Sequence, residues 1–261
     1  MKLKIMKKNN LLNTINVTPN VNFLGTLRSS GYTNYTAIAD IIDNSLDTDV
    51  LSKNVRIHVE KIKDDYQYIQ ISDDGIGMDI DILNEAFKLG AITGKNRELD
   101  LGSYGTGMKA ASLSLGRKFE VHTKSENDAF YIATFDLDEM ISNNIFEIPV
   151  RVGSETEYNS FKMQTQSETG TIVIISKLDR MSNTNASIFR DTLKKKLGLY
   201  YNYFITESNI NIYVNNELVL PIDPMLRNKS FSRPLTQNET FIYKNQEFKF
   251  SVYFLEKMDN K

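Results

Sequence analysis

Acidic and amide side chains recur along the short segment 39–50, which reads ADIIDNSLDTDV. Asp40, Asp43, Asn44 and Asp47 stand three or four residues apart, so on a helix they would form one stripe. The isoleucines between them recur at the same spacing and predict a second stripe that is buried. A stripe of carboxylate and amide oxygens can be a solvated helix surface. It can also present ligands to a cation and a base to water.

Two further segments have the composition of a ligand-binding corner. DDGIGM places Asp73 at the end of a predicted strand, followed by Gly75 and Gly77. Missing side chains at these two positions would let a flat ligand lie against the backbone. GTIVIIS opens another predicted strand with Gly170 and Thr171, where a hydroxyl can point into a pocket floored by the sheet.

A third segment, GSYGTGMKAAS, sets Gly102, Gly105 and Gly107 directly before a predicted helix. The free N–H groups and the dipole at a helix N-terminus bind anions. Together with the other segments, this pattern predicts a nucleotide site.

The elements around these motifs predict an α+β fold. Helices interrupt strands that have one polar face each, which indicates helices covering one side of a mostly antiparallel mixed sheet, a two-layer α/β sandwich. A helix with Ile188, Leu193, Leu197 and Tyr201 on one side follows later in the chain. The expected helices are 34–47, 79–90, 107–116 and 185–205. The expected strands are 55–62, 66–72, 118–125, 129–137, 145–152 and 171–176. Two further strand pairs are expected, a hairpin that turns at Asn215 and Asn216 and a pair at 240–257.

A change of texture near residue 180 suggests two regions. Residues 1–180 would hold the ligand site, and residues 181–261 would be the start of a smaller second α/β region. The second region has only about 80 residues, so we expect either a reduced domain or a fragment of a longer protein.

Composition narrows the class of protein. The 261 residues include 31 Lys+Arg and 33 Asp+Glu, so no bulk charge drives the chain toward nucleic acid or an anionic membrane. Cysteine is absent, which excludes disulfides and thiolate chemistry. With no signal peptide or membrane span visible, we expect a cytoplasmic protein.

The four motifs, DIIDNSLD, DDGIGM, GSYGTGMK and the late GT, resemble those of the GHKL ATPase superfamily and come in that family's order. The superfamily includes gyrase B subunits, MutL, histidine kinases, heat-shock chaperone ATPases and MORC proteins. The segments LRSSGYTNYTAIADIIDNSLD and GSYGTGMKAASLSLG are most similar to the MORC-like and chaperone-like branches. The resemblance spans residues 21–176 and implies the Bergerat fold.

The resemblance also implies roles for single residues. Asn44 would coordinate Mg²⁺ between the phosphates, and Asp73 would accept a hydrogen bond from the adenine amino group with support from Thr171. Asp43 would order waters near the purine, and Asp47 would brace the helix or the phosphate loop. Residues of about 89–104 would form the ATP lid, and Lys109 would add a positive charge near the triphosphate. The full set of expected nucleotide contacts is Asn44, Asp43, Asp47, Asp73, Gly75, Gly77, Met78, Gly102, Ser103, Tyr104, Gly105, Thr106, Gly107, Met108, Lys109 and Thr171.

Asp40 departs from the family pattern, because the residue four before the metal-binding asparagine is usually a glutamate that acts as general base. The aspartate is one methylene shorter, and a general base must come within hydrogen-bond reach of its water. Two hypotheses follow: an ATPase in which Mg²⁺-ATP drives a nucleotide-gated homodimer clamp with Asp40 as catalytic residue, and a nucleotide-binding interaction module without hydrolysis.

Other readings of the sequence are weaker. GAITGK has too few residues between its glycines for a P-loop, and GSYGTG reverses the dinucleotide-binding glycine order. His58 and His122 fall at polar strand positions, so no helical phosphoacceptor histidine is visible. Whether the client of such a protein is a protein or a nucleic acid does not follow from these residues.

Overall fold

A computed structural model describes residues 23–47, 50–62, 65–88, 107–182, 185–227 and 232–255. The main sheet is built from β1 (Asn54–Ile62), β2 (Asp65–Asp73), β3 (Gly116–Lys124), β4 (Phe130–Asp136), β5 (Val150–Val152), β6 (Gly170–Leu178), β7 (Asn211–Val214) and β8 (Glu217–Leu218). The helices are α1 (Leu24–Leu27), α2 (Asn34–Leu46), α3 (Ile80–Phe87), α4 (Gly107–Leu115), α5 (Leu137–Asn143), α6 (Glu155–Thr165), α7 (Ala186–Tyr200) and α8 (Asn202–Thr206). A hairpin of β9 (Ser232–Tyr243) and β10 (Gln246–Leu255) completes the described chain.

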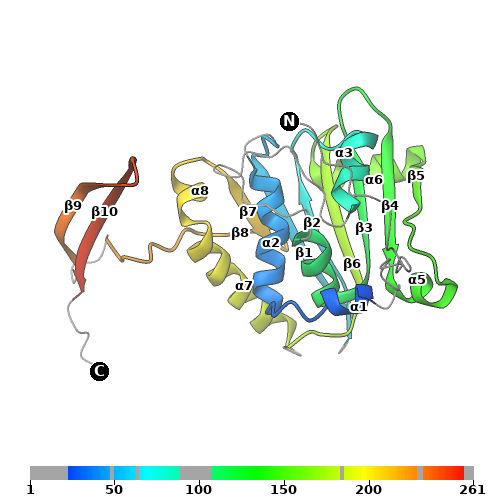
Figure 1. Cartoon of the computed structure of the whole chain (residues 1–261), viewed down its shortest axis with the longest axis horizontal. Helices are drawn as coiled ribbons and strands as arrows, with labels where there is room; N and C mark the ends of the chain where they lie inside the picture. Colours follow the sequence, from blue (N-terminus) through cyan, green and yellow to red (C-terminus); the bar gives the residue numbers. More distant parts are fainter. Residues whose placement is uncertain are drawn as a thin grey trace, which may run out of the picture.

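The eight strands lie in the order β5-β4-β3-β6-β2-β1-β7-β8. β7 pairs with β1 in parallel, and the other pairings within this sheet are antiparallel. Helices α2, α4 and α7 lie across one face of the sheet (Figure 1). This mixed, mostly antiparallel α/β sandwich confirms the predicted fold class.

α2 forms as its sequence predicts, and Thr33 caps its N-terminus. The Thr33 side chain accepts a hydrogen bond from the Thr36 N–H, and the Thr36 side chain accepts one from the Thr33 N–H, which is a reciprocal capping box. The buried stripe of α2 includes Ile38, Ile41 and Ile42, each at most 2% exposed. This stripe holds the polar stripe of the helix in a fixed orientation above the sheet.

Two predicted hairpins are confirmed. β1 and β2 pair antiparallel, with Ile57 opposite Ile71 and Val59 opposite Ile69 on the core face. β7 and β8 are joined by Asn215 and Asn216, which both have positive φ (47° and 67°), the geometry of the tight turn that matches strand twist.

The region from Asp136 to Thr165 differs from the prediction. The expected strand 145–152 is reduced to its last three residues as β5, and two helices that were not predicted, α5 and α6, flank it. α6 begins with a capping box between Ser154 and Glu157, which is visible in the sequence as S-x-x-E.

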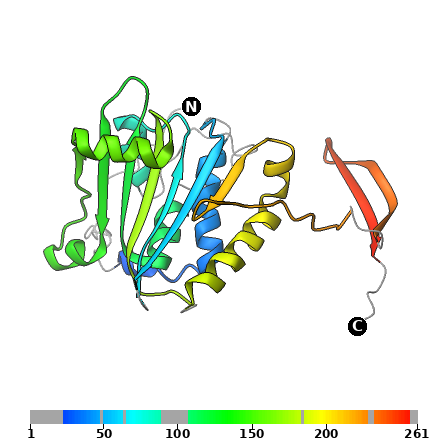
Figure 2. The same ribbon diagram turned by 180° about the vertical axis from the view of Figure 1, so that it is seen from behind.

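α6 also covers the second face of the sheet, so the expectation of helices on one side only is corrected. Its Phe161 is 1% exposed and packs with Phe130, Ile132 and Ile172 in a small core separate from the main one. Figure 2 shows α6 lying across this opposite face. The outward isoleucines of β4 and β6 are thereby buried.

The second region is joined to the first by the sheet itself. β7 extends the sheet at β1, and α7 stacks its Phe189 on Tyr35 of α2, with 5.1 Å between the ring centroids. The buried side of α7 contains Phe189, Leu193 and Leu197, whereas Ile188, expected there, is 54% exposed. The division of the chain at residue 180 remains a prediction, but the sheet continues across it.

The β9–β10 hairpin forms a separate two-stranded sheet and stands apart from the main sheet in both views (Figures 1 and 2). Phe241 stacks on Phe248 across the two strands, with 5.1 Å between the ring centroids. The predicted strand pair is confirmed, and β9 begins earlier than expected, at Ser232.

Within the described residues, no helix combines the length and the apolar character needed to span a bilayer.

The α6 core makes a first prediction. Phe161→Ala should lower the free energy of unfolding by about 3 kcal/mol, because it removes a buried aromatic ring and leaves a cavity. Met163→Ala, on the same helix but at a residue that is 80% exposed, should change it by less than about 0.5 kcal/mol. Urea denaturation of both variants measures the difference. Equal stability of the two variants would contradict the packing of α6 on the sheet.

Candidate functional site

A buried carboxylate lies at the centre of the site. Asp73 is the last residue of β2 and is 5% exposed. Its Oδ1 accepts hydrogen bonds from the N–H groups of Gly75 (3.0 Å) and Thr171 (3.2 Å), and its Oδ2 accepts one from the Ser45 hydroxyl (3.0 Å). Burial raises the pKa of Asp73 to about 6, and the three hydrogen bonds oppose this shift.

The polar residues beside Asp73 come from neighbouring strands, each at the end of a row of apolar side chains. Asp73 pairs with Thr171 on β6, and Thr171 pairs with Thr123 on β3, so the three side chains share one face at one level of the sheet. The Thr123 hydroxyl lies 3.2 Å from the Thr171 hydroxyl and accepts a hydrogen bond from the Met78 N–H (2.8 Å). The floor of the site is therefore a connected polar network set into the core.

The glycines of DDGIGM have a different structural reason from the one expected. A Cβ at Gly75 would lie 2.6 Å from the Val50 carbonyl oxygen, and one at Gly77, which has φ +69°, would lie 2.0 Å from the Lys124 carbonyl oxygen. The chain's own backbone fills the space that these missing side chains leave. Tight packing of this corner, rather than room for a ligand, requires the two glycines.

Asp40 lies at the junction of three elements. Its Oδ2 accepts a hydrogen bond from the Tyr32 hydroxyl (2.9 Å), and a Cβ placed at Gly107 would lie 2.8 Å from the same oxygen. Gly107 is the first residue of α4, so the carboxylate of Asp40 lies beside the N-terminus of that helix. Burial raises the pKa of Asp40 above its ordinary value, and the Tyr32 hydrogen bond opposes the shift.

Asn44 is oriented by its own helix. Its amide nitrogen donates to the Asp40 carbonyl oxygen (3.1 Å), which leaves the amide oxygen as the atom that can accept or coordinate. Among the described residues, no group of three or more His, Asp or Glu side chains is arranged to hold a metal ion. An amide oxygen that acts together with phosphate oxygens and water fits Mg²⁺, which is rarely held by protein ligands alone.

The other two carboxylates of the stripe, Asp43 and Asp47, lie on the side of α2 that faces α7 and at the C-terminus of α2. The Asp43 carboxylate faces α7, where its Oδ1 lies 2.6 Å from the Tyr201 hydroxyl. Burial raises the pKa of Asp43, and the nearby charges of Asp40 and Asp47 add to the shift. Asp47 occupies the C-cap position of α2 and is 6% exposed, and its expected bracing role stays a prediction.

Most of the second glycine segment lies outside the described residues. The predictions for the lid and for five expected contacts therefore lie outside the described residues: Gly102, Ser103, Tyr104, Gly105 and Thr106. Met108 is partly buried against the core at the start of α4.

The expected contact between Lys109 and phosphate stays a prediction, and in this structure the Lys109 ammonium has other partners. The Lys109 ammonium is buried and donates to the carbonyl oxygens of Ala86 (2.6 Å) and Lys88 (3.0 Å), at the C-terminal end of α3. A cation at this end of a helix stabilises the helix dipole. Burial lowers the pKa of Lys109 to about 8.

Four side chains of the site were not expected from the sequence. Ser45 and Thr123 had a visible signal, because each is a polar residue at the next position of an otherwise apolar row, on α2 and on β3. Tyr32 and Tyr201 had none, since their partners on α2 are set by tertiary contacts. The structure thus brings together Asp40, Asn44, Asp73 and Thr171 around α2 and the sheet, and adds these four.

Comparison with known proteins agrees with this geometry. Residues 32–171, more than half of the chain, match the family of histidine kinase-, DNA gyrase B-, and HSP90-like ATPases. The chain belongs to this family and carries its ATP-binding domain.

Proteins named as ATPases of the MORC group are similar in sequence to part of this chain. ATPase MORC2B of Mus musculus is 32% identical over 120 residues (43% of this chain, 11% of the relative), and ATPase MORC2 of Homo sapiens is 27% identical over 180 residues (56% and 17%). ATPase morc-1 of Caenorhabditis elegans is 25% identical over 257 residues (77% and 29%). These matches span less than a third of each relative's length.

The buried charge of Asp73 makes a prediction about stability. Because its pKa is raised in the folded protein, the folded state binds the proton more tightly than the unfolded state, and stability falls as pH rises from about 4 to 6. Asp73→Asn keeps an acceptor oxygen for the two backbone donors and removes the charge. At pH 8 the variant should be more stable than the wild type by up to about 3 kcal/mol, and this gain should shrink toward pH 4.

Urea denaturation of both proteins at pH 8 and pH 4.5 measures this difference, and Asp81→Asn, at an exposed residue of α3, serves as the control. Destabilisation of Asp73→Asn at pH 8 would show that the carboxylate contributes to stability instead of opposing it.

Proposed function

We propose that this chain binds ATP together with Mg²⁺, hydrolyses the ATP, and uses the nucleotide to gate association of two subunits as a clamp. The observation that carries the proposal is that α2 holds both an otherwise costly buried carboxylate, Asp73, through Ser45, and a second carboxylate, Asp40, which lies beside the N-terminus of α4. A protein retains a destabilising buried charge chiefly where function requires it.

The two carboxylates suit the two ends of the nucleotide. Asp73 would accept a hydrogen bond from the adenine amino group, with Thr171 and Thr123 supporting it from the neighbouring strands. The free N–H groups at the start of α4 would bind phosphate oxygens. Asn44 would supply the oxygen ligand for Mg²⁺, which neutralises charge on the phosphates when bound.

Asp40 is the residue that would take a proton from water as the water oxygen attacks the γ-phosphorus and ADP leaves. Its shorter side chain is compensated by position, because Oδ2 already lies against Gly107 at the head of the phosphate-binding helix. Burial raises the pKa of Asp40 toward the range in which a general base works well near neutral pH. Both features support hydrolysis over binding alone.

A test of hydrolysis distinguishes an ATPase from a nucleotide-binding interaction module that does not hydrolyse ATP. Asp40→Ala should reduce phosphate release at least about 100-fold, because it removes the general base, while ATP affinity stays within about threefold. Asp81→Ala should retain the wild-type rate. A coupled phosphate assay and calorimetry measure the two quantities. Wild-type release equal to that of Asp40→Ala would favour the nucleotide-binding module.

The clamp makes a prediction about assembly. The nucleotide-free chain should be a monomer, and a non-hydrolysable ATP analogue with Mg²⁺ should convert it to a dimer, because the γ-phosphate would select the closed state. Size-exclusion chromatography with light scattering measures the mass. A stable dimer without nucleotide, or a monomer at saturating analogue, would contradict the clamp.

Clients, a cytoplasmic location and the activity of a longer protein remain expectations, since the relatives extend far beyond the matched region.

A further inference from the structure

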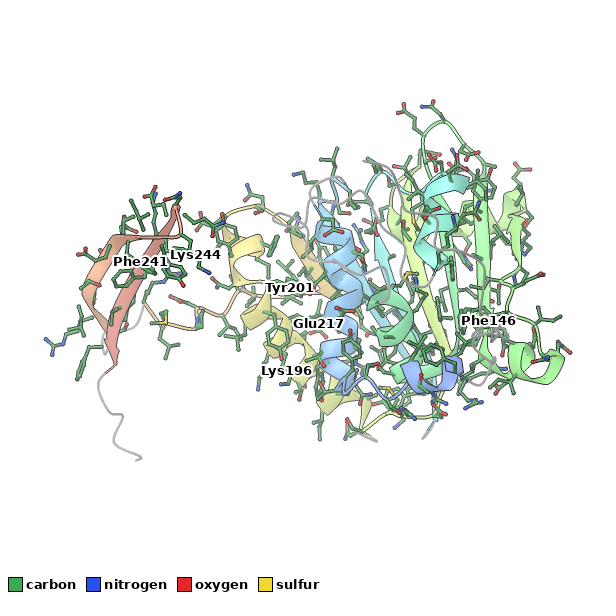
Figure 3. The ribbon with its side chains drawn as sticks, in the orientation of Figure 1. Phe146, Lys196, Tyr201, Glu217, Phe241 and Lys244 are labelled. Carbon is green, nitrogen blue, oxygen red and sulfur yellow. The ribbon has the colours of Figure 1, made fainter. Side chains whose placement is uncertain are left out.

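Tyr201 connects α7 to the helix that carries the catalytic residues. It follows the last residue of α7, is 3% exposed, and lies in the main hydrophobic core. Figure 3 labels Tyr201 on the side of α2 that faces α7 and α8. Its hydroxyl lies 2.6 Å from Asp43 Oδ1 and 2.8 Å from the Ala39 carbonyl oxygen. Tyr201 lies outside residues 32–171, the part that matches the family.

These two contacts fall on special positions of α2. Ala39 and Asp43 each come one residue before a residue of the site, Asp40 and Asn44. Successive residues of an α-helix are related by a rotation of about 100°, so a group that holds Ala39 and Asp43 also fixes the direction of both following side chains. Rotation or sliding of this turn would move the base and the metal ligand together.

An open hollow of about 440 Å³ lies between α2 and the end of α7 and α8, and Thr36, Asp40, Asp43, Tyr201 and Phe204 are among its lining residues. Nearer the N-terminus of α2, the Tyr35–Phe189 stack and Lys196, whose ammonium lies 5.3 Å from the centre of the Tyr35 ring, also connect the two helices. Toward the middle of α2, the Tyr201 hydroxyl donates hydrogen bonds to Ala39 and Asp43.

We infer that Tyr201 is a positioning residue of the ATPase centre, which holds Asp40 and Asn44 in place through Ala39 and Asp43. This inference rests on the proposed binding of Mg²⁺-ATP. It assigns to α7 and α8 a second role besides extending the sheet, because displacement of the end of α7 would be transmitted to the base and the metal ligand. An error of about 1 Å in such a group can cost about 100-fold in rate.

Tyr201→Phe removes one oxygen and keeps the ring in the core. We expect affinity for a non-hydrolysable ATP analogue in EDTA to stay within about twofold, whereas the extra affinity gained with Mg²⁺ should fall about tenfold and the rate of phosphate release at least about tenfold. Calorimetry with and without Mg²⁺ and a phosphate assay measure these quantities. Tyr203→Phe, at a residue of α8 that is 66% exposed, is the matched control.

Asp43→Ala tests whether Tyr201 acts through its hydrogen bond to Asp43. In that background Tyr201→Phe should add less than about a twofold further loss, because both changes break the same link. Thermal melting checks that each variant is folded. An unchanged Mg²⁺ gain in Tyr201→Phe, or an equal loss of affinity with and without Mg²⁺, would overturn the positioning role.

These readouts also separate the inference from the proposed function. If the wild type binds nucleotide without turnover, hydrolysis fails as a function and the Mg²⁺ comparison still decides on Tyr201. If the wild type binds no nucleotide, both are overturned.

Discussion

The burial of the Asp73 carboxylate is the constraint around which the rest of the site is organised. A charge taken out of water must be met by hydrogen bonds, and here the turn after β2, strand β6 and helix α2 each supply one through Gly75, Thr171 and Ser45. Three donors from three segments fix the end of the sheet relative to the helix above it. Because the pKa of Asp73 is still raised, these donors do not fully offset the loss of hydration. The Asp73 carboxylate would therefore gain from a further hydrogen bond donated by a ligand.

The same helix serves both ends of the proposed nucleotide. Its buried isoleucines fix α2 on the sheet, Ser45 binds Asp73 near its C-terminal end, and Asp40 lies beside α4 about one and a half turns earlier. Spacing along one rigid element would thus set the distance between the proposed base-binding and phosphate-binding ends. Contacts from Tyr32 and Tyr201 then define the orientation of the acidic stripe. A stripe that looks like solvated surface in the sequence is instead engaged on two sides by tyrosines.

Local patterns made much of the fold predictable, and long-range contacts limited the rest. α2, the β1–β2 hairpin and the turn at Asn215 and Asn216 follow from periodicity and turn chemistry, which act between near neighbours in the chain. α6 was missed because it has few apolar residues, although its capping box is readable. The α3 carbonyl oxygens that Lys109 contacts do not follow from the sequence, because they lie more than twenty residues away. For the same reason, the sequence shows that Asp43 belongs to a polar stripe but not that Tyr201 is its partner.

The central claim is that Asp73 selects the 6-amino group of an adenine nucleotide. ITP differs from ATP in carrying an oxo group in place of that amino group, so it presents an acceptor where the carboxylate needs a donor. Calorimetric titration of the wild-type chain with each nucleotide at pH 8 in the presence of Mg²⁺ is the most direct test. The account predicts that ATP binds at least about 100-fold more tightly than ITP, since a site built for a hydrogen-bonding group strongly rejects an analogue without it. Equal affinity for ATP and ITP, or no binding of either, would contradict it.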